Sequence, residues 1–342
     1  MLSKQLWFTS AGNIEIKEQD IGGPNENDVL VESVYSAIST GTELLIYRGQ
    51  FPSDIALDTS IDDLKSQAGS FPMRYGYASV GTIVQAGSKV DASVIGKTVF
   101  AFTPHASHFT VPFDQTILLP DDITPVDAVF LANMETAVNL VHDGNPLLGE
   151  MVVVTGLGIV GLLTTQILSQ FPLAELVVIE KIKSRQKLIS NLDNCKFYSP
   201  TSDNNIELKK QIQSSSFNEL EADLVFELTG NPEALNLAVD ICGYNGRIVI
   251  GSWYGNKAAN INLGGKFHRN RIEIISSQVS TIAPQLTGRW DKSRRLEFAF
   301  KMIREISPNK FISKIIDFEQ VQQAYTLLDK SPEDYSQILL KY

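Results

Sequence analysis

The sequence predicts an α/β protein that combines a β-rich domain with a doubly wound parallel sheet. Three observations predict this class. The chain has 342 residues, enough for about two domains. Residues 1–120 read as short strands separated by turns, and from residue 151 onward strands alternate with helices. We therefore expect a β-rich domain over residues 1–122, completed by residues 285–342, and a second domain over residues 123–284.

The first domain is expected to be an irregular barrel or sandwich, because its short segments are β-branched or alternate between apolar and polar residues. The segments expected to form strands are LWF (6–8), NIEIKE (13–18), VLVESVYSAI (29–38), SVGTIVQAG (79–87), TVFAF (98–102) and HFTVPFDQTILLP (108–120).

The second domain is expected to begin with a helix, because small and apolar residues recur at helical spacing over residues 124–144. The run MVVVT that follows is continuously apolar, which is typical of a parallel strand covered on both faces. Strands are expected at 151–155, 175–180, 222–227, 246–251 and 271–277, and helices at 159–171, 184–192 and 231–242. The tail is expected to form helices at 294–306 and 317–329 and strands at 310–317 and 336–342.

Composition excludes several classes of protein. Lys and Arg number 29 against 39 Asp and Glu, a net charge of −10, so neither nucleic acid nor an anionic membrane surface is an expected partner. Two cysteines, Cys195 and Cys242, cannot build a disulfide scaffold or a Cys-rich zinc site. The start of the chain has no signal-peptide pattern, and the longest apolar stretch, 151–168, is too short and glycine-rich to cross a membrane. We expect a cytoplasmic protein.

Residues 49–76 form a long polar segment punctuated by Pro and Gly. Segments of this length in compact domains are often lids or binding loops. A solvated excursion without a binding role is the alternative interpretation. The acidic residues of the segment are Asp54, Asp58, Asp62 and Asp63.

The most informative motif is the run Gly156-Leu157-Gly158-Ile159-Val160-Gly161. A GxGxxG pattern alone is weak, but this one follows an expected strand and opens an expected helix, which is the context of a dinucleotide-binding turn. Gly156 would make the tight turn, Gly158 would let the backbone approach a pyrophosphate, and Gly161 would let the helix pack against the strand. The free N–H groups of the helix N-terminus would attract the anion.

An acid is expected about 20 residues after such a turn, where it accepts hydrogen bonds from the adenosine ribose. Glu180 ends the segment ELVVIE and lies in this range. Its carboxylate would repel a 2′-phosphate and so favours NAD over NADP. Lys181, Lys183 and Arg185 follow and would soften that repulsion, so NADP stays possible.

Two later strand ends carry residues expected to border the cofactor. Ligands in open α/β sheets bind outside the carboxyl ends of the strands. Thr229 and Gly230 follow one expected strand, and Gly251 and Ser252 follow the next. Each of these glycines can also be read as an ordinary turn residue.

At these residues the chain resembles the medium-chain dehydrogenase/reductase superfamily, which includes the zinc-type alcohol and polyol dehydrogenases. The stretches ISTGTELLIYRG (38–49) and RYGYASVGTIVQAGSKV (74–90) precede the glycine turn in the order found in that family. The STGTE stretch and the Gly-Tyr pair resemble the branch that contains bacteriochlorophyllide dehydrogenase. The resemblance covers nearly the whole chain and implies a GroES-like catalytic domain, a Rossmann domain, and hydride transfer in the cleft between them.

The chain departs from the zinc-type pattern at each expected ligand. The residues Ser39-Thr40-Gly41-Thr42-Glu43 replace a stretch that begins with Cys, and Gly76-Tyr77-Ala78 replaces Gly-His-Glu. Ala132 stands at the third ligand position. The cysteines of the structural zinc lobe are also missing, and zinc needs Cys, His or carboxylate ligands. We therefore expect no zinc; Glu135 lies near the third position but cannot make a site alone, and a metal on His105 and His108 is a weaker alternative.

Without zinc, a side chain must polarise the carbonyl and move the proton during alcohol oxidation or ketone reduction. Tyr77 stands at the position of the family's ligand histidine and is the first candidate for the acid or base. Thr42 matches the family's proton-relay hydroxyl, and Ser39 and Thr40 are expected on the same wall. Glu43 would orient these groups or pair with a cation. Further candidates, for each of which ordinary packing is an equal interpretation, are His105, His108, Asn133, Glu135, Lys266 and His268.

Three functions are compatible with these residues. The first is a zinc-independent oxidoreductase that transfers a hydride between NAD(H) and a secondary alcohol or ketone, such as a sugar, a cyclitol or a larger ring. The second is an NADPH-dependent quinone or enone reductase, and the third is a non-catalytic dinucleotide-binding protein. The partner is then a small-molecule substrate. The strand RIEIISSQVS (271–280) could also pair across a two-fold axis, so we expect a homodimer.

Overall fold

The protein is described by a computed structural model that covers residues 1–52, 69–200, 208–212 and 221–342. Its contacts divide the chain into two compact units. Unit 1 contains Met1–Ala132 and Ile303–Tyr342, and unit 2 contains Asn133–Met302. The functional domain boundaries expected above, 1–122 with 285–342 and 123–284, remain a prediction.

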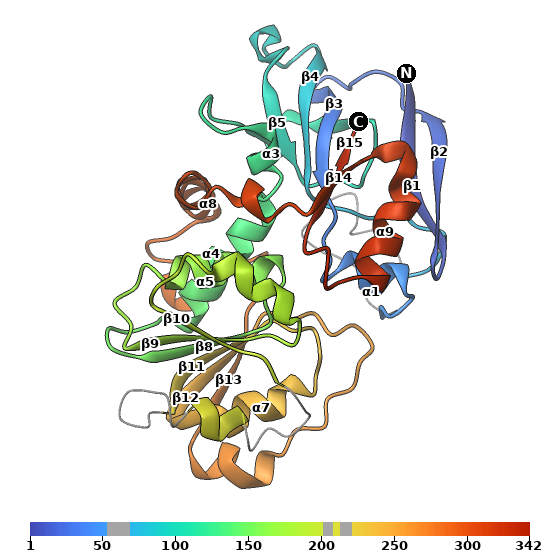
Figure 1. The fold of residues 1–342 in the computed structure, drawn as a ribbon. Helices are drawn as coiled ribbons and strands as arrows, with labels where there is room; N and C mark the ends of the chain where they lie inside the picture. The colour runs from blue at the N-terminus through green and yellow to red at the C-terminus, as the bar shows by residue number, and fades with distance from the viewer. Residues whose placement is uncertain (53–68, 201–207, 213–220) are drawn as a thin grey trace. The chain divides into compact units, whose positions relative to one another are not determined.

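Unit 1 is built on a seven-stranded sheet and a two-stranded hairpin (Figure 1). The hairpin pairs β1 (Leu2–Ser10) with β2 (Asn13–Asp20). The order of the large sheet is β14-β15-β3-β4-β5-β7, and β6 lies off this path and pairs antiparallel with residues 28–32 of β3. Its strands are β3 (Asp28–Ala37), β4 (Ser79–Ala86), β5 (Thr98–Ala101), β6 (His108–Pro112), β7 (Thr116–Leu118), β14 (Lys314–Asp317) and β15 (Ile338–Lys341).

The C-terminal tail is part of unit 1. β15 pairs antiparallel with β3 and parallel with β14, so the last residues of the chain lie beside a strand from its first forty. α9 (Val321–Lys330) packs against α1 (Glu43–Tyr47) and against β2, which brings Tyr325 next to the residues that follow β3.

Unit 1 also contains the short helix α3 (Pro125–Ala128). Its N-cap is Thr124, whose side chain accepts the backbone N–H of Asp127.

Unit 2 is a doubly wound sheet of six parallel strands, which confirms the expected fold class. The strand order is β10-β9-β8-β11-β12-β13. β8 therefore lies at the centre, and the order reverses between β8 and β11, the place where open sheets bind dinucleotides. The strands are β8 (Met151–Thr155), β9 (Glu175–Ile179), β10 (Cys195–Tyr198), β11 (Ala222–Glu227), β12 (Cys242–Ile250) and β13 (Glu273–Ser276).

Unit 2 contains the helices α5 (Ile159–Leu168) and α7 (Ala234–Ile241) and most of α4 (Leu131–Gly144) and α8 (Lys292–Ile306). All five residues of β8 are buried, as the continuous apolar run predicts for a covered parallel strand.

Some elements differ from the sequence predictions. The helix expected over 184–192 is a 3₁₀ segment, Lys183–Ile189. The run 108–120 forms two strands, because a 3₁₀ turn at Phe113–Gln115 interrupts it. The candidate loop at 49–76 lies largely outside the described residues. These undescribed residues include its four aspartates.

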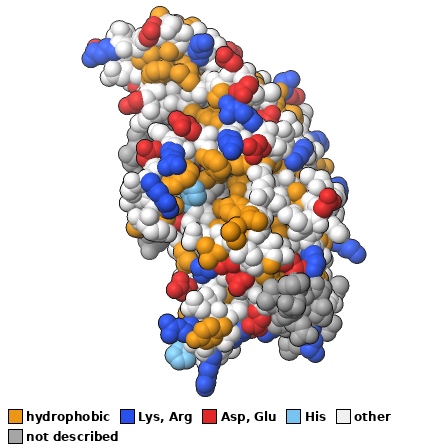
Figure 2. Space-filling view, turned by 90° about the vertical axis from the view of Figure 1, so that its left-hand side faces the viewer, with side chains coloured by type: hydrophobic (Ala, Val, Ile, Leu, Met, Phe, Trp, Pro, Cys, Tyr) orange, Lys and Arg blue, Asp and Glu red, His pale blue; other side chains and the backbone are white. Residues whose placement is uncertain are grey.

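On the face shown in Figure 2, acidic and basic side chains are interspersed and do not gather into a single basic patch. Among the described residues, none of the helices combines the length and apolarity that crossing a lipid bilayer requires.

Candidate functional site

The glycine turn of unit 2 has the geometry that its motif predicts. Gly156 has φ +91°, and a Cβ at this position would lie 2.6 Å from the carbonyl oxygen of Leu228. A Cβ on Gly161 would lie 2.0 Å from the carbonyl oxygen of Gly156. Both positions therefore require glycine, one for the turn and the close approach of β11, the other for the packing of α5 on the turn.

Gly158 differs from its two neighbours in the motif. A Cβ on Gly158 would meet nothing within 4 Å, and the residue has ordinary dihedrals, φ −68° and ψ −179°. Folding alone therefore does not demand glycine here. Gly158 is the N-cap of α5, where Ile159 and Val160 begin the helix and its free N–H groups can bind an anion. The space over Gly158 is what a pyrophosphate would need.

Glu180 follows β9 and is tied to the glycine turn. Its Oε2 accepts the backbone N–H of Leu157 at 2.6 Å, and its Oε1 accepts that of Ile182 at 2.8 Å. The guanidinium of Arg185 lies 3.4 Å from Oε2. The carboxylate therefore holds the turn in place, and because two carboxylate oxygens offer about four acceptor sites, it keeps capacity for a ribose hydroxyl.

The residues expected at the other strand ends form one cluster around a group that the sequence reasoning missed. Glu227, the last residue of β11, is fully buried and accepts the backbone N–H of Thr229 at 2.8 Å and the hydroxyl of Tyr254 at 2.5 Å. Burial and this carboxylate raise the pKa of Tyr254, so its hydroxyl stays protonated. Ser252 Oγ accepts the N–H of Gly230 at 2.9 Å, and Gly251 N donates to the carbonyl of Glu227 at 3.1 Å. An acid at the end of the run ADLVFE is the signal that could have identified Glu227.

In unit 1, the pairing of two strands brings the Ser39 and Tyr77 segments together. β3 and β4 are antiparallel with Ser36 opposite Ser79, and the N–H of Ala37 donates to the carbonyl of Ala78 at 2.9 Å. The residues just after β3 and just before β4 are therefore neighbours. Here the hydroxyl of the half-buried Tyr77 donates a hydrogen bond to Ser39 Oγ.

Glu43 contacts the Ser39 end of this pair and is fully buried. Its Oε1 accepts the backbone N–H of Ser39 at 2.8 Å. Its Oε2 lies 2.9 Å from Nε2 of the equally buried His105 and accepts the hydroxyl of Tyr325. Burial first, and the carboxylate second, raise the pKa of Tyr325, which keeps this hydroxyl a donor. The side chain that pairs with Glu43 is therefore His105.

The network continues to the end of the chain. Nδ1 of His105 lies 2.7 Å from Ser36 Oγ, which lies 2.9 Å from the hydroxyl of Tyr342. Tyr325 and Tyr342 were missed at the sequence level because they belong to the tail, more than 200 positions away from Ser39 along the chain. The two threonines of the motif are half-buried, and Thr42 is the N-cap of α1 without a capping bond from its side chain. Thr40 lies between Ser39 and this helix start.

Of the further candidates, His105 contacts Glu43, whereas the others have contacts elsewhere or are exposed. His108 Nδ1 lies 3.2 Å from Ser107 Oγ, so it does not share a ligand point with His105. Lys266 binds Glu221 at 2.8 Å, and His268 is exposed. Asn133 and Glu135 are buried in unit 2, where Glu135 pairs with Arg295.

At the three positions that resemble zinc ligands, the residues do not fit a zinc ion. Ser39, Tyr77 and Ala132 supply no Cys, His or carboxylate at the positions that resemble zinc ligands. Two described side chains of a suitable type, His105 and Glu43, contact each other at 2.9 Å. Within the described part of the chain, no group of three or more His, Cys, Asp or Glu side chains could hold a metal ion.

Comparisons with known proteins agree with this architecture. A family model described as "zinc-binding dehydrogenase" matches residues 160–294. D-guloside 3-dehydrogenase of Escherichia coli K12 is 22% identical over 323 residues, covering 90% of this chain and 91% of the relative.

Solved structures have the same fold over the whole chain. A short chain alcohol dehydrogenase of E. coli CFT073, complexed with NADH, superposes with a TM-score of 0.77 at 18% identity and covers 100% of this chain and 99% of its own. A structure from Sinorhizobium meliloti 1021 bound to NADP gives a TM-score of 0.78 at 18% identity and covers 100% of both chains. The family model over residues 160–294, the E. coli relative and the shared fold together support the resemblance of this chain to the medium-chain dehydrogenase/reductase superfamily.

Proposed function

We propose that the protein is a zinc-independent oxidoreductase that transfers a hydride between NAD(H) and a secondary alcohol or its ketone. The observation that carries this proposal is the hydroxyl pair Tyr77–Ser39, supported from below by buried Glu43, at the positions where the zinc-type pattern places metal ligands. A small neutral polar substrate, such as a sugar or a cyclitol, suits a wall of hydroxyl groups. The name of the E. coli relative, a guloside dehydrogenase, points the same way.

The nicotinamide, when bound to the glycine turn of unit 2, supplies or accepts the hydride. The protein must supply or accept the proton. In ketone reduction the Tyr77 hydroxyl would donate its proton to the carbonyl oxygen. Ser39 Oγ now accepts from Tyr77, and because a serine hydroxyl rotates freely, it can turn to donate to the phenolate that forms. In alcohol oxidation the same pair would run in reverse, with Tyr77 as the base.

Glu43 would act through Ser39 as a positioning residue. It holds the backbone N–H of Ser39 and is itself held by His105 and Tyr325, so the serine has little freedom to move away from Tyr77. Catalysis by hydrogen-bonding groups depends on such fixed geometry, because donors that must reorganise during the reaction contribute less. Thr40 and Thr42 supply further hydroxyls that can orient the substrate.

The zinc proposal has a direct test. We expect protein purified after exposure to zinc and then dialysed to retain far less than one zinc ion per chain, because the required donor set is missing. Elemental analysis measures this content. Turnover that survives a strong chelator would support the same conclusion, whereas one tightly held zinc per chain would overturn it.

The cofactor preference follows from Glu180. We expect NADH to bind at least about tenfold more tightly than NADPH, because a buried carboxylate beside the ribose repels a 2′-phosphate. Titration followed by nicotinamide fluorescence measures both dissociation constants. The variant Glu180→Gln keeps an oxygen that can accept the N–H of Leu157 but loses the negative charge. It should therefore reduce the ratio of the dissociation constant of NADPH to that of NADH. Tighter binding of NADPH by the unaltered protein would contradict this use of Glu180.

One observation favours a second candidate. Arg185 lies 3.4 Å from Glu180, and Lys181 is adjacent in sequence, so cations stand where they could attract a 2′-phosphate. An NADPH-dependent quinone or enone reductase would follow if NADPH bound more tightly and enones turned over. Nucleotide binding without turnover of any alcohol, ketone or enone would leave a non-catalytic binding protein. A cytoplasmic location and a homodimer, formed through β13 at the edge of its sheet, remain predictions.

A further inference from the structure

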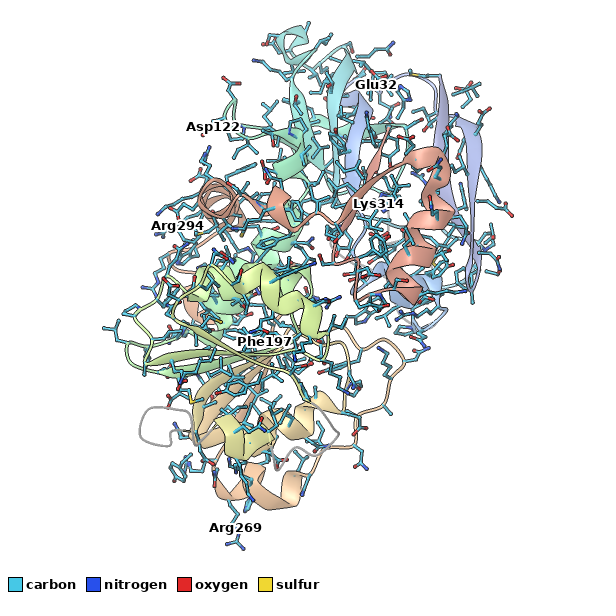
Figure 3. The ribbon with its side chains drawn as sticks, in the orientation of Figure 1. Glu32, Asp122, Phe197, Arg269, Arg294 and Lys314 are labelled. Atoms are coloured by element: carbon cyan, nitrogen blue, oxygen red, sulfur yellow. The ribbon has the colours of Figure 1, made fainter. Side chains whose placement is uncertain are left out.

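A fully buried arginine in unit 2 has all five of its N–H donors engaged. Nε and Nη2 of Arg295 lie 3.1 and 2.8 Å from Oε1 of Glu135, and Nη1 lies 2.5 Å from Oδ1 of Asn139. The side chains of Arg295 and Glu135 are 1% and 3% exposed. The neighbouring Arg294, labelled in Figure 3, is exposed on the same helix, so the burial is particular to Arg295.

The other two donors of Arg295 bind the main chain of one segment. Nη1 donates to the carbonyl of Thr281 at 2.9 Å, and Nη2 donates to the carbonyl of Val279. Asn139, held by Arg295, donates in turn to Ser277 Oγ at 3.0 Å. A single ionic cluster on α4 and α8 therefore fixes residues 277–281, which we call the post-β13 segment.

The post-β13 segment leaves the sheet at its ligand-binding edge. It directly follows β13, and the N–H of Ser277 donates to the carbonyl of Ile250 at the carboxyl end of β12. In a sheet of this strand order, the dinucleotide crosses from one half to the other at the reversal point. Glu180 occupies the half made of β8, β9 and β10 and suits the adenosine end. The half made of β11, β12 and β13 then receives the nicotinamide end.

A buried ion pair is a costly way to obtain stability, because removing two charges from water offsets most of their attraction. Apolar residues of similar volume would fill the same space. Apolar residues could not make five hydrogen bonds in fixed directions, as Arg295 does. Two of these five bonds go to main-chain carbonyls of a loop. The arrangement therefore suits a need for accurate placement of the post-β13 segment.

We propose that Glu135 and Arg295 are positioning residues that hold the post-β13 segment in place for the nicotinamide end of the bound nucleotide. The proposal rests on the proposed function, since it needs a nicotinamide nucleotide in unit 2. It predicts that loss of the pair weakens the binding of the nicotinamide half of the ligand and leaves the binding of the adenosine half unchanged. ADP-ribose, which contains the adenosine, the pyrophosphate and a ribose but no nicotinamide ring, separates these two contributions.

The experiment measures dissociation constants of NADH and ADP-ribose by calorimetry on the full chain. We expect Arg295→Met to weaken NADH about tenfold or more while ADP-ribose changes by less than about twofold. Glu135→Gln, which removes the charge and keeps an acceptor, should weaken NADH less. If Arg295→Met does not fold, the same measurements are made on Arg295→Lys, because lysine keeps the positive charge but cannot make the five directed hydrogen bonds of arginine.

Arg247→Met is the matched control. Arg247 binds Glu150 at 2.7 and 2.8 Å and the carbonyl of Gly144 at 3.1 Å, but near the amino end of the strands, so both ligands should bind it normally. Equal weakening of NADH and ADP-ribose in the Arg295 variants would reduce the pair to a purely structural role, and unchanged NADH binding would refute the proposal. Failure of the unaltered protein to bind NADH would instead refute the proposed function itself.

Discussion

Gly158→Ala is expected to weaken NADH binding about 10- to 100-fold while the protein keeps its stability. The added methyl group meets no protein atom within 4 Å, and the backbone dihedrals of Gly158 suit alanine, so folding should tolerate the change. The same methyl group would occupy the space through which a pyrophosphate reaches the N–H groups that open α5. Calorimetric titration with NADH and thermal unfolding measure the two effects separately, and the melting temperature should shift by less than about 2 °C.

Two other glycines serve as controls for this prediction. Gly161→Ala places its Cβ 2.0 Å from the carbonyl oxygen of Gly156, so it should lower the free energy of unfolding by more than about 2 kcal/mol. Gly264→Ala also meets nothing within 4 Å, but it lies away from the motif and should change neither property. Normal NADH affinity in Gly158→Ala would show that the pyrophosphate does not lie on this turn.

Tyr77→Phe is expected to lower kcat about 100- to 1000-fold, with the dissociation constant of NADH changed by less than about twofold. The phenylalanine ring keeps the packing of Tyr77 against Tyr75, whose ring centroid lies 6.3 Å away, and removes only the proton donor. A panel of polyols, sugars and cyclic ketones, assayed with NAD or NADH, supplies the substrate for this measurement. Ser39→Ala should also lower kcat, because a phenolate at residue 77 would lose the hydroxyl that stabilises it.

Tyr47→Phe is the matched control for the loss of a tyrosine hydroxyl. The hydroxyl of Tyr47 accepts a hydrogen bond from Gln322 at 3.0 Å, so its removal costs stability of about 1 kcal/mol but should leave kcat unchanged. An unchanged kcat in Tyr77→Phe would remove Tyr77 from the mechanism. Equal losses in the two variants would indicate a general effect of weakened packing in unit 1.

Local sequence determined the strand, glycine turn and helix that are proposed to bind the nucleotide. The run from β8 through the glycine turn into α5 is contiguous, so strand, turn and helix could be predicted from neighbouring residues and from the steric demands of Gly156 and Gly161. Continuous apolar strands likewise predicted a covered parallel sheet. Glu180 could be predicted as a candidate because its distance from the turn is set by the length of one helix and one strand.

Tertiary structure alone decided what surrounds Glu43 and Glu227. The partners of Glu43, His105 and Tyr325, come from segments 62 and 282 positions away, and no periodicity or spacing relates them. Strand pairing in unit 1 and the return of the tail beside β3 bring them together. A buried carboxylate must find its donors wherever the fold places them, so this part of the site depends on long-range packing that a local pattern does not encode.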